Sequence, residues 1–503
     1  MRSKLAMRNM VMNLFLQILV MVSGLILPRF FMETYGSAVN GMITSVNQFL
    51  MYLGLAEAGI STASVVALYA PLAHEQEDDV NAILSATRKF YNRSGMLFLG
   101  LVLALTVVYP FFISGQLESG MVRTMVLVLA SSTLVDFFFL GKYRVLLTAN
   151  QKGYIVALIQ SVGAIVNMIV SILLIHIGAS VLIVKAVATG VYILRLILVR
   201  IYVKREYPNV DFHAEPKMDA LNQRGAALLH QVVGIIVNNT DVVLLTALIG
   251  RGSLLEVSVY SAYNLVVTAV NTLLTSFSNG LTAGFGEVIS KGEDDILRTN
   301  YSSYEYMYFV ILFIAVVCMG VLIIPFISVY TINMTDVNYV RPLIGVLFTI
   351  IVLLQNIRIP GVTIICAAGH YKETRYQAIL EAVINLVISI ALIQRIGMAG
   401  ALIGTVCSYG YRSIDVIIYN SRKLVKGTGK KTLVRVGRNI VAVMALILLG
   451  CHFVPQRMES FVSWFLYAVI SGGISSGVIL LLNYVAEPEA FRKLIEKVKV
   501  VVK

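Results

Sequence analysis

Apolar runs of about twenty residues recur from one end of this 503-residue chain to the other. A helix needs about 20 mostly apolar residues to cross the hydrocarbon core of a bilayer. With 58% hydrophobic and only 13% charged residues, the chain has too little polar surface for a soluble globular protein. We therefore predict an all-α polytopic membrane protein with about 14 transmembrane helices, at residues 9–32, 38–69, 94–114, 122–147, 154–176, 179–203, 226–250, 256–284, 305–329, 340–366, 376–395, 398–419, 436–454 and 461–484.

The net charge of +13 is unevenly distributed between the polar connectors. If the N-terminus is cytoplasmic, the basic segments, among them residues 2–8, 422–435 and 492–503, all fall on the cytoplasmic side. This is the positive-inside pattern. It indicates an even number of spans with both termini cytoplasmic, and it explains the basic charge without nucleic-acid binding.

Motif searches give no catalytic set, no metal site and no cofactor. The cysteines, at 318, 366, 407 and 451, are far apart within apolar runs and lack metal-ligand or disulfide spacing. The sequence starting at His74 lacks the second histidine of a zinc-protease helix, and residues 427–431 lack the earlier glycine of a phosphate loop. The apolar run after Arg8 has no clear cleavage site, so we interpret it as the first span rather than a signal peptide.

An internal duplication relates the two halves of the chain. Residues 167–178 match residues 385–397, and residues 38–47 match residues 262–271, both at an offset of about 220 residues. An even number of spans separates the copies, so both have the same orientation in the membrane. We predict two pseudo-symmetric six-helix lobes and a C-terminal helix pair, with boundaries at 1–203 (first lobe), 204–225 (cytoplasmic linker), 226–420 (second lobe), 421–435 (basic loop) and 436–503 (helix pair and tail).

The second matching pair carries amides and hydroxyls inside predicted spans. Both copies have Asn, Thr and Asn at i, i+4 and i+7, which places them on one helical face: Asn40, Thr44 and Asn47, and Asn264, Thr268 and Asn271. Two such stripes indicate the walls of a water-filled substrate cavity. The alternative is hydrogen bonding between helices within each lobe, which contributes about 0.6–2 kcal/mol per bond.

Charged residues at membrane depth are the other candidates, because each costs about 2.5–3.5 kcal/mol at a helix centre unless it faces protein or water. Arg29, Asp241 and Arg358 lead, since they lie within long spans and no partner is obvious in the sequence. Glu57 is a further cavity candidate, and Asp136 and Glu381 also lie within predicted spans. Alternatives exist for several of these charges: Arg29, Lys185 and Arg195 can reach the interface, Arg412 and Asp415 can pair with each other, and Lys142 and Arg144 can serve as orienting charges.

Several segments resemble the polysaccharide-transporter branch of the multidrug/oligosaccharidyl-lipid/polysaccharide (MOP) exporter superfamily. The resemblance spans nearly the whole chain and rests on the fourteen-span plan and on four loose motifs: Leu27-Pro28-Arg29-Phe30 with Tyr35-Gly36, residues 53–60 (Leu-Gly-Leu-Ala-Glu-Ala-Gly-Ile), residues 239–245 (Asn-Thr-Asp-Val-Val-Leu-Leu) and residues 259–263 (Val-Tyr-Ser-Ala-Tyr).

The resemblance implies a flippase of the bacterial plasma membrane, not an enzyme, that translocates a polyprenyl-diphosphate-linked oligosaccharide by alternating access for cell-surface polysaccharide biosynthesis. Arg29 and Arg358 would bind the pyrophosphate, while the two polar stripes, Tyr260 and Tyr263 would bind sugar hydroxyls. The partners expected are the lipid-linked oligosaccharide and membrane lipids, with a coupling ion (Na⁺ or H⁺) and a polysaccharide polymerase as further candidates. The sequence leaves the glycan and the ion open.

Three alternatives stay open at this stage. A multidrug cation antiporter of the same superfamily would hold acidic residues in its cavity. Residues 10–32 contain no acidic residue, but Glu57 and Asp241 keep this alternative open. A flippase for the peptidoglycan lipid precursor differs only in the headgroup. A membrane scaffold that transports nothing would not need the polar stripes.

Overall fold

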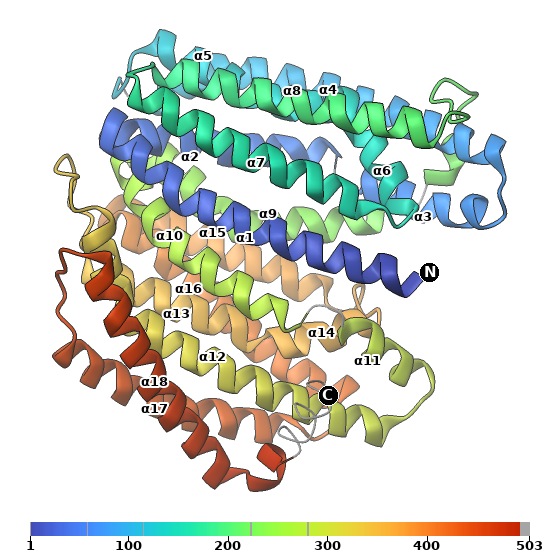
Figure 1. Ribbon diagram of the computed structural model, residues 1–503. Helices are drawn as coiled ribbons and strands as arrows, with labels where there is room; N and C mark the ends of the chain where they lie inside the picture. Colours follow the sequence, from blue (N-terminus) through green and yellow to red (C-terminus); the bar gives the residue numbers. More distant parts are fainter. Residues whose placement is uncertain (1, 58, 114, 222–223, 279–280, 493–503) are drawn as a thin grey trace. The chain divides into compact units, whose positions relative to one another are not determined.

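The computed structural model describes residues 2–57, 59–113, 115–221, 224–278 and 281–492, which contain helices and no strand. They form two compact units, Met1–Ser258 and Val259–Lys503. Figure 1 shows the helices of both. The division falls inside α10 (Ser253–Ser276).

The first unit contains long apolar helices with several short or irregular segments between them. They are α1 (Arg2–Tyr35), α2 (Ser37–Leu53), η1 (Gly54–Glu57), α3 (Ile60–Ala73), α4 (Glu77–Phe112), α5 (Ser119–Val135), η2 (Asp136–Leu140), α6 (Gly141–Ala149), α7 (Gly153–His176), α8 (Val181–Glu206), η3 (Met218–Leu221) and α9 (Arg224–Leu248).

Within this unit, α1 packs against α7, and α5 packs against both α4 and α8 (Figure 1). The buried core takes Leu84 and Phe98 from α4, Val126 from α5 and Val184 from α8. Many of the remaining apolar side chains on these helices are exposed, as expected for helices that bury one face in protein and present the other to lipid.

The second unit is built around α12, a helix of 37 residues. Its helices after α10 are α11 (Leu281–Ser290), α12 (Asp294–Tyr330), α13 (Pro342–Ile357), α14 (Ile359–Ala367), α15 (Arg375–Ile396), α16 (Met398–Tyr419), η4 (Asn420–Leu424), α17 (Gly429–Phe453) and α18 (Phe461–Ala486). The α15 and α16 helices pack as a pair, while α13, α17 and α18 pack against α12.

The predicted spans agree with the observed helices. Eleven helical stretches among the described residues are long and apolar enough to cross a membrane. The other three predicted spans are α2 with α3, α9 and α16. Helix α2 has 17 residues and α3 has 14, so neither is long enough alone, and α16 carries Arg412, a residue type that lowers the hydropathy of a span without preventing it from being buried in protein.

The first compact unit extends beyond the residues 1–203 predicted for the first lobe: it runs to Ser258 and includes α9, which packs with α2. The reason is local: Tyr52 and Thr240 hydroxyls lie 2.6 Å apart, and Ser45 and Thr246 hydroxyls lie 2.7 Å apart. These bonds join the two helices into one compact body.

Candidate functional site

A cluster of charges occupies the first unit where two spans depart from regular α-helix. Glu57 ends the 3₁₀ segment η1, and Asp136 begins the π-helical segment η2. Arg144, on α6, donates from Nη1 to Asp136 Oδ2 at 2.9 Å and from Nη2 to Glu57 Oε1 at 3.1 Å. The Tyr91 hydroxyl donates to the same Glu57 oxygen at 2.5 Å. We call Glu57, Asp136 and Arg144 the first charge cluster.

The first charge cluster places two carboxylates against one guanidinium. Irregular helical segments such as π-turns occur often at functional sites because they re-aim a side chain that a regular helix would direct elsewhere. Here they bring Glu57 and Asp136, from different spans, to one arginine. With both acids ionised, the cluster carries one excess negative charge, which suits it to interact with a cation.

A second cluster lies in the second unit, where the predicted span 340–366 is interrupted between α13 and α14. Arg358 stands at this break and forms an ion pair with Glu381 of α15. Arg412 of α16 lies 3.6 Å from Glu381 and donates to Asp415 at 2.6 Å. The guanidinium of Arg358 also lies 4.5 Å from the centre of the Tyr409 ring. These four residues, Arg358, Glu381, Arg412 and Asp415, form the second charge cluster, in which opposite charges balance.

The duplication shows where the units differ. By the match between residues 167–178 and 385–397, Gly163 corresponds to Glu381, whereas Arg195, beyond the one-residue insertion, aligns two positions past Arg412. The first unit thus has a glycine where the second has an acid, and a Cβ on Gly163 would lie 2.0 Å from Arg195 Nε. Arg195 Nε is buried without a hydrogen-bond partner among the described residues. The glycine therefore makes room for the Arg195 side chain, at a position where the second unit has Glu381.

The three leading charges, for which no partner is obvious in the sequence, all have partners in the structure. Arg29 is paired with Glu33, one turn along α1, at 3.0 Å. Arg358 is paired with Glu381 across helices. Asp241 is 6% exposed and also takes part in interactions. The partner of Arg29 lies four positions along the same helix, whereas the partner of Arg358 is supplied by packing of another helix.

The first polar stripe changes from buried to exposed along α2. Asn40 is buried, and its Nδ2 donates to Ser258 Oγ at 2.9 Å. Thr44 is half-buried and Asn47 is exposed. Asn40 therefore takes part in helix–helix hydrogen bonding, which was the alternative interpretation, whereas Asn47 leaves an amide on the surface of a span.

The second stripe on α10 shows a similar change. Asn264 is half-buried and Thr268 is exposed. Asn271 donates to Gln355 Oε1 at 2.9 Å and accepts from Asn356 Nδ2 at 2.7 Å, so α10 and α13 are joined by an amide network.

Tyr260 and Tyr263 pack around Phe348. The Tyr263 ring stacks on Phe348 with centroids 5.6 Å apart, and Tyr260 meets the same ring edge-on at 5.2 Å. The Tyr263 hydroxyl is buried and donates to the Tyr339 carbonyl at 2.9 Å. In this conformation both tyrosines contribute to packing within the second unit.

Sequence reasoning missed one residue of the first charge cluster. Arg144 was interpreted as an orienting charge at a span end, but it joins Glu57 to Asp136. The spacing gave no clear signal, because residues eight positions apart in a regular α-helix differ by about 80° around the axis and about 12 Å along it. The π-helical turn between them was not visible in the sequence.

The fold is that of a group of membrane transport proteins. The chain matches a structure of the lipid II flippase MurJ in an inward closed conformation at a TM-score of 0.66 and 14% identity. The match covers 97% of this chain and 99% of the MurJ chain. It matches an inward-facing multidrug-resistance MATE family transporter of the MOP superfamily at a TM-score of 0.65 and 12% identity, with 86% of this chain and 95% of that chain covered.

A third structure, of a MATE transporter in a bent conformation, matches at a TM-score of 0.56 and 13% identity, with 89% of this chain and 97% of that chain covered. The sequence shows no match to a family model or to a curated protein. At these identities the comparisons define the fold and support a multi-pass membrane protein, and they leave the substrate open.

Proposed function

We propose that this protein is a flippase that translocates a polyprenyl-diphosphate-linked oligosaccharide across the bacterial plasma membrane by alternating access. The observation that carries the proposal is a fold shared from end to end with a lipid flippase, over 97% of this chain and 99% of the other. The MATE structure, by contrast, leaves about a seventh of this chain unmatched, since it covers 86% of it.

The physics of the cargo supports a protein-lined route. A pyrophosphate–sugar headgroup is anionic and hydrated, and transfer of such charges into hydrocarbon costs far more than thermal energy. The exposed polar groups on apolar spans, Asn47 on α2 and Thr268 on α10, are the ones that we propose contact the sugar. An amide or hydroxyl that faced only lipid would lose its hydrogen bonds to water without compensation.

The cations proposed for the pyrophosphate are Arg29 and Arg358. Both are ion-paired, Arg29 with Glu33 and Arg358 with Glu381. Binding of the headgroup by these residues therefore includes exchange of a carboxylate partner for a phosphate, and bidentate recognition of phosphate is a property of arginine. The first charge cluster, which carries an excess negative charge, is the candidate binding site for a coupling H⁺ or Na⁺.

Two alternative transport functions are compatible with the same fold. A peptidoglycan-precursor flippase would move the lipid II headgroup, and a multidrug antiporter would move a cationic drug. In the proposed role the termini are cytoplasmic, and enzymes that make and polymerise the glycan act before and after translocation.

Headgroup translocation in proteoliposomes tests the role of the polar stripes. Asn47→Ala and Thr268→Ala should together lower the rate of translocation at least about tenfold, since each removes a group that hydrogen-bonds to sugar. The matched controls are Met51→Ala and Leu273→Ala, on the same two helices, whose side chains are 47% and 62% exposed. Equal rates in the polar and apolar variants would remove the stripes from the mechanism.

A further inference from the structure

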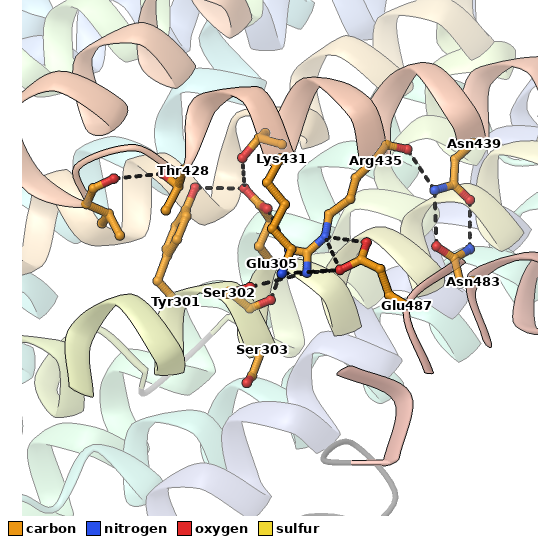
Figure 2. Close-up of polar contacts among 12 residues, drawn as sticks. Tyr301, Ser302, Ser303, Glu305, Thr428, Lys431, Arg435, Asn439, Asn483 and Glu487 are labelled. Atoms are coloured by element: carbon orange, nitrogen blue, oxygen red, sulfur yellow. Dashed lines mark hydrogen bonds and ion pairs between the residues drawn. The ribbon is translucent and has the colours of Figure 1, made fainter. Parts of the chain in front are cut away.

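A polar pocket lies in the second unit, away from the second charge cluster. It has a volume of about 640 Å³ and is lined where α12 begins, where α17 begins and where the chain leaves α18. Figure 2 shows part of this region, with Ser302 and Ser303 on α12, Thr428 and Lys431 at the start of α17, and Glu487 after α18. None of these residues was a candidate for cargo binding.

The lining carries three cations, Arg298, Lys426 and Lys431. Of the two lining acids, Glu487 is held by an arginine behind the pocket wall. Arg435 donates from Nε to Glu487 Oε1 at 2.9 Å and from Nη2 to Oε2 at 2.6 Å. Glu487 pairs with both the buried Arg435 and the lining Lys431, and Arg435 also pairs with Glu305. The three lining cations and two lining acids therefore leave one excess positive charge.

Neutral hydrogen-bond donors also reach this pocket. Ser302 Oγ accepts from Arg435 Nη2 at 3.2 Å, which leaves the serine hydrogen available to a ligand. At the start of α17 the Thr428 hydroxyl donates to the Val425 carbonyl at 2.8 Å and does not cap the helix. The amide group of the lining residue Lys431 therefore has no acceptor among the residues described. Free amides at a helix start favour an anion.

We propose that this pocket binds a phosphoryl group, carried either by a phospholipid headgroup or by free phosphate. Cations, a hydroxyl and a helix-start amide together match the several oxygens of a phosphoryl group, and each charge-assisted bond to it is stronger than a neutral one. The volume of about 640 Å³ also holds a headgroup larger than phosphate itself. The helices α17 and α18, whose ends border the pocket, are both long and apolar enough to span a membrane, which puts the pocket within reach of lipid headgroups.

The test is a binding titration of the purified full-length protein with three probes: phosphatidylglycerol, diacylglycerol, which has no phosphoryl group, and inorganic phosphate. Native mass spectrometry counts the bound lipid molecules, and calorimetry measures the binding of inorganic phosphate. The double variant Arg298→Gln/Lys426→Gln should weaken binding of the phosphoryl probe by about tenfold or more. Both residues are exposed, so the variant should unfold at the wild-type temperature, which is measured alongside.

The matched control is Lys430→Gln, an exposed lysine at the same helix start that does not line the pocket. It should bind within about twofold of wild type, because it removes one positive charge at the same helix start but no lining group. Tight binding of phosphatidylglycerol without competition by phosphate identifies a lipid headgroup, and competition by phosphate identifies a site for the free anion. The proposal is overturned if Lys430→Gln weakens binding as much as the double variant, if diacylglycerol binds as tightly as phosphatidylglycerol, or if neither phosphoryl probe binds.

Discussion

Arg144 Nη1 lies 2.9 Å from Asp136 Oδ2, across the π-helical segment η2 that separates α5 from α6. The same guanidinium reaches Glu57 at 3.1 Å. One arginine thus joins two carboxylates from different spans of the first unit. The contact fixes the position of the helical irregularity and of the charge that we propose for cation coupling.

Removal of Arg144 should therefore destabilise the protein and slow transport. Arg144→Gln leaves two carboxylates without their cation, and we expect a loss of about 1.5–3 kcal/mol in unfolding free energy. A double-mutant cycle with Asp136→Asn, followed by denaturation in detergent, should give a coupling energy of at least about 0.5 kcal/mol. Arg123→Gln, at an exposed position on α5, should change stability by less than about 0.5 kcal/mol. Additive effects of Arg144→Gln and Asp136→Asn would contradict the pairing.

Arg435 is the most buried cation that the structure describes, at 1% exposure. It bonds to Glu305 at 2.8 Å and to Glu487 at 2.6 Å, and so joins α17 to α12 and to the chain after α18 (Figure 2). Arg435→Met leaves buried carboxylates uncompensated and should cost about 3–5 kcal/mol. Lys431→Gln, at a 53% exposed side chain that also approaches Glu487, should cost less than about 1 kcal/mol. Denaturation of both variants measures the difference; similar losses would show that burial of the ion pairs does not decide their strength.

The Glu487 carboxyl should make stability depend on acid pH. Burial alone would raise its pKa, but hydrogen bonds and charge from Arg435 and Lys431 outweigh burial and hold the pKa below its ordinary value of 4.5. A lowered folded-state pKa contributes stability that is present above the unfolded-state pKa and is lost as pH falls through the folded-state value.

The measurement is the difference in melting temperature between wild type and Glu487→Gln as a function of pH. The difference should stay constant from about pH 7 to about pH 5 and shrink below about pH 4.5. A difference that grows on acidification would show that the pKa is raised and not lowered.

Close packing of α2 on α10 depends on Gly41. A Cβ at this position would lie 1.8 Å from the Leu254 carbonyl oxygen, which is backbone and cannot rotate away. Gly41→Ala should therefore destabilise the first unit by about 1–3 kcal/mol. At Gly24 on α1 an added Cβ meets nothing within 4 Å, so Gly24→Ala should be neutral or slightly stabilising. Thermal unfolding of the pair tests this; equal stability of the two variants would contradict the contact.

The helices of this protein are largely predictable from its sequence, because each span must by itself present about 20 apolar residues to lipid. The predicted span 154–176 differs from α7 by one residue. Proline predicts helix breaks less well. Four predicted spans contain a proline at which the sequence alone predicts a break, Pro28, Pro110, Pro325 and Pro360, but the first three lie inside continuous helices. Only Pro360 adjoins a break, at Arg358. A proline removes its own N–H and disturbs one carbonyl a turn earlier, which a long helix packed on its neighbours can tolerate.

The charge clusters were less predictable because their partners are distant in the chain. Glu57 and Arg144 differ by 87 positions, and Arg358 and Glu381 by 23. The sequence identified most of these charges as unusual for their depth in the membrane, while helix packing decides which of them meet. The same holds for Asn40, whose partner Ser258 is 218 residues away.

The most direct test of the transport proposal is the time course of headgroup exposure in proteoliposomes that contain the purified protein. The vesicles hold a polyprenyl-diphosphate-linked oligosaccharide in one set, lipid II in a second, and a fluorescent cationic drug in a third. The proposal predicts that the protein moves the oligosaccharide lipid at least about tenfold faster than vesicles without protein, and faster than lipid II or the drug. Accumulation of the drug with no movement of either lipid would contradict it and would assign the fold here to cation export.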